Sequence, residues 1–308
     1  MLPWCDVRKG RIRPLWEWQR EARLTVGYDP ERRVSVSERD VTYLTVEDEA
    51  LPARIYQPNG DGPFPLMVDI HGGAWHAGRY WQNQLLSRAI AASGMIVVAP
   101  EFRRAPKHPY PIQVQDVHYA IRWAKAHAAE LNAIPDHVGG LGTSAGGHTL
   151  MLIAMRPHDP RYAALPLPEA PNVDATIGYT LMLWAVLDPH YRYLYERREG
   201  LDQHADSSVA YFLNEETMIE ANPQAILDRK EPVPLPPTLI VQPVPDINIP
   251  REIPERFAES VRAAGGSIEL EWFPAEGHGF AREPSESTDR ALVLMKAFIA
   301  RQFAAVAA

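Results

Sequence analysis

A serine flanked by small residues is the first feature of this sequence that could do chemistry. Residues 142–146 read Gly-Thr-Ser-Ala-Gly, with Ser144 at the centre, and they precede an apolar run over residues 148–155. Glycines on both sides of a serine permit a sharp strand-to-helix turn that exposes the hydroxyl, and the helix N-terminus then directs N–H groups towards an oxyanion formed there. The motif alone is equally compatible with a glycine-rich turn that carries an incidental serine.

A second glycine-rich segment strengthens the case for a nucleophile. Residues 71–75 read His-Gly-Gly-Ala-Trp and directly follow an apolar strand predicted over 66–70. Glycines there would let the loop pass close to Ser144 and present backbone N–H groups to a tetrahedral oxyanion. A plain turn with a structural histidine is the alternative. The residues expected to form the oxyanion hole, with the first of them allowing the loop to bend, are Gly72, Gly73, Ala74 and Ala145.

A nucleophilic serine also needs a base and an acid that orients the base. Of the eleven histidines, His278 is the best base, because it lies in a glycine-flanked loop between the last predicted strand and the last predicted helix. Asp246 follows a predicted strand over 238–241 and precedes His278 in the chain, as the acid does in a Ser–acid–His order. Asp188, after the preceding predicted strand, is the rival acid.

The elements that must position these residues are short apolar strands that alternate with helices. This rhythm predicts an α/β fold with a mainly parallel sheet covered on both faces. Two stretches interrupt it, about 1–40 and about 189–232, although the segment 11–27 itself has a helical pattern. Because ligands bind beyond the carboxyl ends of the strands in such sheets, we expect both stretches to form a cap within one domain over 1–308. The expected strands are 41–46, 53–56, 66–70, 95–99, a short one ending near 141, 175–183, 238–241 and 268–273, and the expected helices 81–93, 113–131, 145–156, 251–264 and 286–303.

Composition excludes several classes of protein. The 308 residues carry a net charge of −8, and a chain without a clustered basic face argues against a nucleic-acid partner. A single cysteine, Cys5, rules out an intrachain disulfide. The longest apolar runs are too short for membrane insertion, and the N-terminus lacks the apolar region of a secretory signal, so a cytoplasmic location is expected. No zinc-like spacing or phosphate loop is present, and therefore no metal or cofactor is expected.

With these residues in view, the chain resembles the α/β-hydrolase superfamily and, within it, the hormone-sensitive-lipase-like carboxylesterases. The resemblance implies an eight-stranded, mostly parallel sheet, a two-part cap and no cofactor. The sequence departs from the family pattern in three ways: His-Gly-Gly-Ala-Trp is nearer the HGGxW of kynurenine formamidases, Thr143 replaces the usual acid, and 242–245 lack the usual glycine. The matching segments are 71–73, 102–111, 142–147, 246–250 and 277–280.

These observations predict a serine carboxylesterase that acts on small esters, with Ser144 as nucleophile, His278 as base and Asp246 as acid. An arylformamidase-like amidohydrolase and a non-catalytic ligand-binding protein of the same fold are the alternatives. The expected partner is a small-molecule ester, and a homo-oligomer is left open. Large side chains in the segments expected to line the site favour short acyl groups. The residues expected to line the substrate pocket are Trp75, Trp184 and Tyr191.

Overall fold

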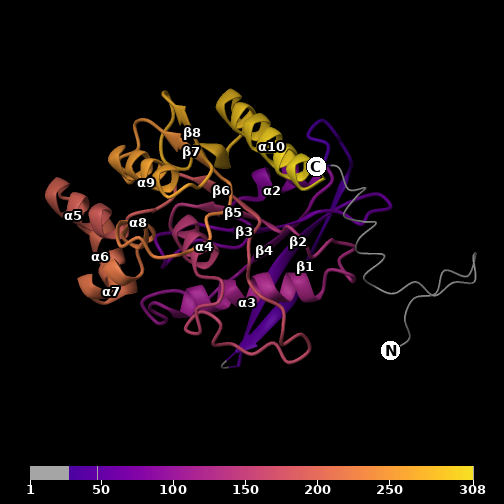
Figure 1. Cartoon of the computed structure of the whole chain (residues 1–308), viewed down its shortest axis with the longest axis horizontal. Coiled ribbons are helices and arrows are strands. Elements are labelled where there is room, and N and C mark those ends of the chain that lie inside the picture. Colours follow the sequence, from indigo (N-terminus) through magenta and orange to yellow (C-terminus); the bar gives the residue numbers. More distant parts are fainter. Residues whose placement is uncertain (1–27, 47, 308) are drawn as a thin grey trace, which may run out of the picture.

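The computed structural model describes residues 28–46 and 48–307. The helix expected over 11–27 and most of the expected N-terminal cap segment lie outside the described residues. An eight-stranded sheet with strand order β1-β2-β4-β3-β5-β6-β7-β8 forms the centre of the molecule (Figure 1). The strands are β1 (Val36–Val46), β2 (Glu49–Pro58), β3 (Leu66–Ile70), β4 (Ile96–Pro100), β5 (Gly139–Thr143), β6 (Tyr179–Leu183), β7 (Thr238–Pro243) and β8 (Ile268–Phe273).

The sheet is mostly parallel, as the sequence predicts. β1 pairs antiparallel with β2, and β2 antiparallel with β4, whereas every pairing from β4 through β3 to β8 is parallel. All residues of β3, β4, β5, β6 and β7 are buried. Strands buried on both faces read as continuous apolar runs, which explains why the sequence revealed most of them.

Three strands begin four or five residues away from the expected position. β2 begins at Glu49 and not at residue 53. β1 begins at Val36 and not at residue 41. The sequence did not reveal its first part, because residues 37–40 are exposed polar side chains at the sheet edge and show no apolar alternation. These residues belong to the sheet, although they fall at the end of the expected cap segment 1–40. β6 begins at Tyr179 and not at residue 175, since the preceding residues run as a loop towards the strand.

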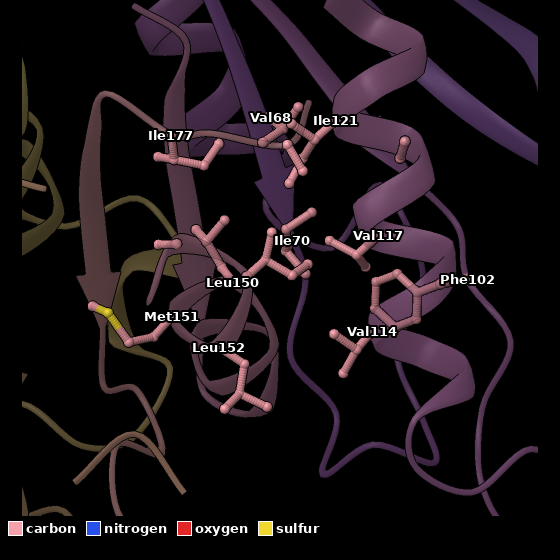
Figure 2. Packing of buried hydrophobic residues seen from close by; sticks show 14 of the residues in the cluster. Val68, Ile70, Phe102, Val114, Val117, Ile121, Leu150, Met151, Leu152 and Ile177 are labelled. Carbon is pink, nitrogen blue, oxygen red and sulfur yellow. The ribbon is translucent and has the colours of Figure 1, made fainter. Parts of the chain in front are cut away.

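Alternate residues of each buried strand feed two separate hydrophobic layers. Val68 and Ile70 of β3 belong to the layer that includes side chains of α3 and α4, whereas Met67 belongs to the opposite layer with α2 and α10. Figure 2 shows Val68 and Ile70 between Ile121 and Leu150. Successive strand side chains point to opposite faces, so one strand supplies both layers. The helices that cover the two faces of the sheet are α2 (Gln84–Ala91), α3 (Ile112–Ala126), α4 (Ala145–Met155), α9 (Glu252–Ala263), η1 (Phe280–Arg282) and α10 (Glu286–Ala307). We call the sheet and these helices the body.

Within the second interruption of the pattern, 189–232, the chain forms four helices at one side of the molecule (Figure 1). We call residues 189–232 the helical insertion. Caps at Asp188, Asn214 and Asn222 begin three of these helices, each by accepting a hydrogen bond from a backbone N–H three residues later. The four helices are α5 (Pro189–Glu199), α6 (Asp202–Phe212), α7 (Glu215–Glu220) and α8 (Pro223–Asp228).

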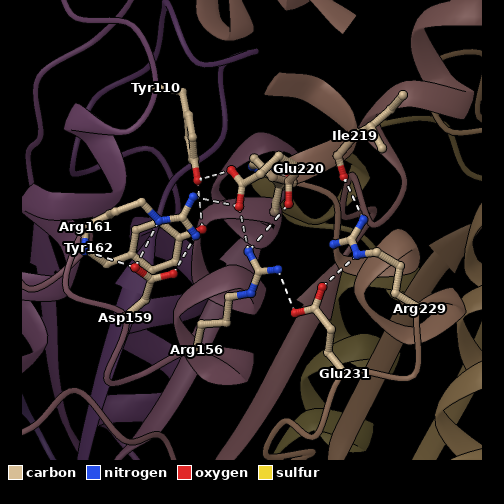
Figure 3. A network of polar contacts seen from close by, with 11 residues as sticks. Tyr110, Arg156, Asp159, Arg161, Tyr162, Ile219, Glu220, Arg229 and Glu231 are labelled. Carbon is tan, nitrogen blue, oxygen red and sulfur yellow. Dashed lines mark hydrogen bonds and ion pairs between the residues drawn. The ribbon is translucent and has the colours of Figure 1, made fainter. Parts of the chain in front are cut away.

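A polar network fastens the helical insertion to the body. The Glu220 carboxylate at the end of α7 accepts from the Tyr110 hydroxyl at 2.8 Å and pairs with Arg156 at 2.9 Å and Arg161 at 2.8 Å. Arg156 also pairs with Glu231 at 2.7 Å. Figure 3 shows Tyr110, Arg156 and Arg161 directed towards Glu220 from separate segments. The insertion is therefore anchored by a multivalent contact, which is stronger than an isolated surface ion pair. No helix within the described residues is long and apolar enough to cross a membrane.

Candidate active site

Ser144 occupies the tight turn between β5 and α4, as its glycine-flanked sequence predicts. Its backbone has φ 51° and ψ −123°, a conformation that is uncommon for a residue with a side chain. The strain is held by the surroundings, since the Ser144 N–H donates to the Leu183 carbonyl at 3.0 Å and the Ser144 carbonyl accepts from Val186 at 3.1 Å. A Cβ on Gly146 would lie 2.2 Å from the His71 carbonyl oxygen, so the turn requires glycine there.

Three side chains from distant parts of the chain form a hydrogen-bonded series. Nε2 of His278 lies 3.1 Å from Oγ of Ser144, and Nδ1 of His278 lies 2.9 Å from Oδ2 of Asp246. The Asp246 side chain is fully buried, whereas the His278 side chain is 18% exposed. The carboxylate is therefore shielded from water, whereas solvent and small molecules can reach the histidine.

The acid loop holds the Asp246 carboxylate in place. Oδ1 accepts from the backbone N–H groups of Asn248 at 2.9 Å and Ile249 at 3.1 Å, and Oδ2 accepts from the Gln242 amide at 3.1 Å. Asp188, the rival acid, is directed elsewhere. It caps α5 and accepts from the Asn222 amide at 2.7 Å.

The loop after β3 lies directly against the serine. A Cβ on Gly72 would be 2.9 Å from the Ser144 Cβ, and Gly73 has φ 123°, so glycine is needed at both positions. Ala74 and Trp75 follow with φ values of 47° and 62°. Within the described residues, the N–H groups of Gly73 and Ala74 have no protein acceptor. The N–H of Ala145, the first residue of α4, has none within its own helix.

Two residues that were not predicted from the sequence, Glu101 and Arg104, support this loop. His71 stacks on Phe102 with ring centroids 4.2 Å apart, and its Nε2 lies 3.4 Å from the Glu101 carboxylate. Arg104 links Glu101 at 2.8 Å to the carbonyl of Gly78 at 2.7 Å. Glu101 and Arg104 lie within or next to the 102–111 segment that carried part of the family resemblance, which was the available signal.

The aromatic residues expected to line a pocket occupy different environments. Trp75 is 1% exposed and Trp184 is 0% exposed, so both belong to the core and present almost no surface. Trp184 nevertheless lies beside the site, with its ring 6.1 Å from that of His278. Tyr191 is partly buried in α5. A large aromatic residue near a motif can therefore belong either to the lining of a pocket or to the core, and the sequence alone did not distinguish the two.

A buried ion pair within α5 of the helical insertion lies against Trp75. Arg192 pairs with Glu196 at 2.6 Å, donates to the Asn248 carbonyl at 3.1 Å, and places its guanidinium 5.6 Å from the Trp75 ring centroid. Burial raises the pKa of Glu196 to about 7. Since Arg192 and Glu196 are 3% and 0% exposed, Arg192 is not part of a solvated surface.

The sheet order and the turn that carries Ser144 are those of the α/β-hydrolase fold class. A family model described as alpha/beta hydrolase fold matches residues 67–282, and the chain belongs to this family. The superfamily membership expected from the sequence is thereby confirmed.

Individual relatives in the family are esterases by name. The chain is 31% identical to esterase LipC of Mycobacterium tuberculosis over 226 residues, which cover 71% of this chain and 53% of LipC. It is 31% identical to the carboxylic ester hydrolase LipN of the same organism, covering 78% of this chain and 64% of LipN. The chain thus spans between half and two thirds of the length of these two relatives. Carboxylesterase NlhH, also from M. tuberculosis, is 29% identical and is covered to 83%.

Solved structures agree with this assignment. Esterase 2 of Thermogutta terrifontis, phosphoramylated by tabun, has a TM-score of 0.69 and 25% sequence identity, and the match covers 88% of this chain and 96% of that one. The propionate-bound form of the same esterase has a TM-score of 0.67 and 25% identity, covering 87% and 94%. The overall architecture of this chain is therefore that of a known esterase.

Proposed function

We propose that this protein is a serine carboxylesterase that hydrolyses small carboxylic esters through an acyl-enzyme. The observation that carries the proposal is the series Asp246–His278–Ser144, with Nε2 of His278 3.1 Å from the serine hydroxyl. The names of the relatives, which are esterases and carboxylic ester hydrolases, support the same class of reaction.

In the acylation step, Oγ of Ser144 attacks the ester carbonyl while Nε2 of His278 takes the hydroxyl proton. The Asp246 carboxylate accepts a hydrogen bond from Nδ1–H of His278. This bond fixes the neutral tautomer with a free Nε2 and stabilises the imidazolium that forms. His278 then donates its proton to the leaving alcohol oxygen as the C–O bond breaks. The acyl group remains on Ser144 as an ester.

The tetrahedral intermediate needs donors for its negatively charged oxygen. We assign this role to the backbone N–H groups of Gly73, Ala74 and Ala145, which have no competing acceptor in the described part of the chain. Ala145 follows Ser144 directly, and Gly73 and Ala74 follow Gly72, which lies against Ser144. Each such donor typically contributes about 3 kcal/mol to transition-state stabilisation. Their rigid placement by the strained loop avoids reorganisation during the reaction.

Deacylation repeats these steps with water as the nucleophile. His278 takes a proton from water, the resulting hydroxide attacks the acyl carbon, and the proton returns to Oγ of Ser144 as the carboxylic acid leaves. Each proton removed from a nucleophile is returned to a leaving oxygen, so the cycle needs no cofactor.

We assign the helical insertion the role of a cap over this site. Its Arg192 contacts both the acid loop, through Asn248, and Trp75 of the loop after β3. Trp184 fills the core directly beside His278, with the two ring centroids 6.1 Å apart. These contacts support a compact site that accepts small esters.

The test is turnover of p-nitrophenyl acetate and butyrate by the purified chain and by Ser144→Ala. We expect hydrolysis by the parent and none above the background rate by Ser144→Ala. An aryl formamide assayed in parallel separates an amidohydrolase from an esterase, since preference for the formamide would replace the proposed substrate class. Binding of esters without any turnover would instead indicate a ligand-binding protein.

A further inference from the structure

A buried carboxylate lies behind the turn that carries the nucleophile. Asp69, on β3, is 2% exposed. Its Oδ1 accepts from the Asn83 amide at 2.7 Å, and its Oδ2 accepts from the Ser87 hydroxyl at 2.6 Å. Among the described residues, no lysine or arginine lies within ion-pair distance of this carboxylate. Asp69 is therefore held by neutral donors, and a carboxylate without a cationic partner is costly to bury in the core.

Asn83 connects this carboxylate to the nucleophile turn. Asn83 occupies the N-cap position of α2, yet its side chain makes no capping hydrogen bond to that helix. Its amide nitrogen donates to Asp69, and its Oδ1 accepts from the Thr143 hydroxyl at 3.3 Å. An asparagine at this position would ordinarily cap its own helix. Here the side chain bridges β3 and β5 instead.

Thr143 is the point where the bridge meets the site. It is the last residue of β5, it is 0% exposed, and Ser144 follows it directly. A Cβ on Gly72 would be 2.9 Å from the Thr143 carbonyl oxygen and 2.9 Å from the Ser144 Cβ. The oxyanion loop and the nucleophile turn are therefore in direct contact at Thr143, where the series Asp69–Asn83–Thr143 ends.

We propose that Asp69 is a positioning residue for the esterase reaction: through Asn83 it fixes Thr143, and with it the distance between Ser144 and the oxyanion loop. This inference rests on the proposed function of Ser144. The carboxylate orients the Asn83 amide, because both of its oxygens accept and only the NH₂ group can face it. The amide oxygen must then face Thr143. With this orientation lost, the serine turn and the oxyanion donors are free to shift relative to each other.

The experiment measures kcat and KM for p-nitrophenyl butyrate in Asp69→Asn and Thr143→Val. We expect kcat to fall roughly 10- to 100-fold in each variant, because a displacement of the reacting groups by about 1 Å causes losses of this size. KM should change by less than about twofold. Thr143→Ser keeps the hydroxyl and should retain kcat close to that of the parent. Thr180→Val is the matched control, since it removes a buried threonine–threonine hydrogen bond of 2.8 Å between β6 and β7, near the ends of these strands that lie away from Ser144. It should leave kcat unchanged.

The double variant Asp69→Asn/Thr143→Val tests whether the two residues act through one path. If they do, kcat of the double variant falls no further than that of either single variant. Losses that multiply, or a kcat in both single variants equal to that of Thr180→Val, would overturn the inference. If Asp69→Asn does not fold, the comparison of Thr143→Val with Thr143→Ser tests the inference. Serine keeps the hydroxyl that donates to Asn83, and valine lacks it.

Ser144→Ala keeps this inference separate from the proposed function. Activity that survives in Ser144→Ala would reject the esterase mechanism itself. An inactive Ser144→Ala together with a fully active Asp69→Asn and Thr143→Val would reject only the role of Asp69.

Discussion

The indole N–H of Trp75 donates to Nδ1 of His148 at 3.2 Å, and this bond joins the oxyanion loop to the helix that begins after the nucleophile. On its other side, Nε2 of His148 donates to the carbonyl of Ala221 in the helical insertion at 2.7 Å. Both partners are satisfied only by neutral imidazole with its proton on Nε2. One fully buried histidine thus connects α4, the oxyanion loop and the insertion.

The first prediction concerns pH and this histidine. Burial lowers the pKa of His148 to about 4 from its ordinary 6.5. A depressed pKa gives stability that is present above pH 6.5 and is lost as pH falls towards 4. We expect the free energy of unfolding to fall over this range, by up to about 3 kcal/mol from this group. His148→Gln should remove that part of the pH dependence.

Urea denaturation at several pH values measures this effect as the difference between the parent and His148→Gln. The difference is needed because Asp69, whose pKa burial raises to about 6, changes stability in the opposite direction. His118, whose pKa burial also lowers to about 4, contributes equally to both proteins. Identical pH profiles for parent and variant would contradict the prediction.

The second prediction separates the two candidate acids. Asp246→Asn should reduce kcat by several orders of magnitude with the fold retained, because an amide can donate to Nδ1 and favours the wrong imidazole tautomer. Asp188→Asn should affect kcat little, since Asp188 caps α5. Steady-state kinetics with circular dichroism as the folding control compares them. A large loss confined to Asp188→Asn would transfer the role to that residue.

The third prediction concerns covalent labelling. Phenylmethylsulfonyl fluoride or an organophosphate should add one group per chain, located on Ser144 by peptide mapping, because only a serine activated by a base and facing oxyanion donors reacts stoichiometrically. Ser144→Ala should not be labelled, and neither should His278→Ala, although the latter keeps the serine. Label on Ser87, Ser93 or Ser207 would show that the nucleophile is misassigned.

The fourth prediction concerns the size of the acyl group. Trp184 is fully buried next to His278, so turnover of p-nitrophenyl esters should be fastest for short acyl chains. Trp184→Ala should shift the preference towards longer chains by opening space beside the histidine, with some loss of stability from the cavity. Fastest turnover by the parent on chains of about ten carbons or more would contradict this, because a confined site excludes them.

The fifth prediction tests the anchoring of the helical insertion. Glu220→Gln removes the charge that Arg156 and Arg161 share, and should lower the free energy of unfolding by about 1–3 kcal/mol, since two cations lose their common partner. Thermal unfolding of the parent and of both variants measures the effect. Glu269→Gln is the control, because Glu269 forms a single exposed ion pair with Arg301. Equal effects of the two substitutions would argue against a special role for the network.

The sequence alone determined the fold class and part of the candidate site. Short apolar strands are recognisable because both of their faces are buried, and the turn at Ser144 is recognisable because its close contacts admit only glycine at neighbouring positions. Ser144, His278 and the oxyanion loop were therefore identified from local patterns. Their assembly at one end of the sheet followed from parallel strand order.

Tertiary structure alone decided what depends on contacts between distant residues. Asp246 and Asp188 both follow strands, and only the path of the acid loop brings one of them to His278. Trp75 was expected in a pocket and lies in the core, because helices of the insertion cover it. Asp69 and His148 have no motif at all. A buried polar side chain is kept by hydrogen bonds to residues far along the chain, and no local pattern in the sequence records those partners.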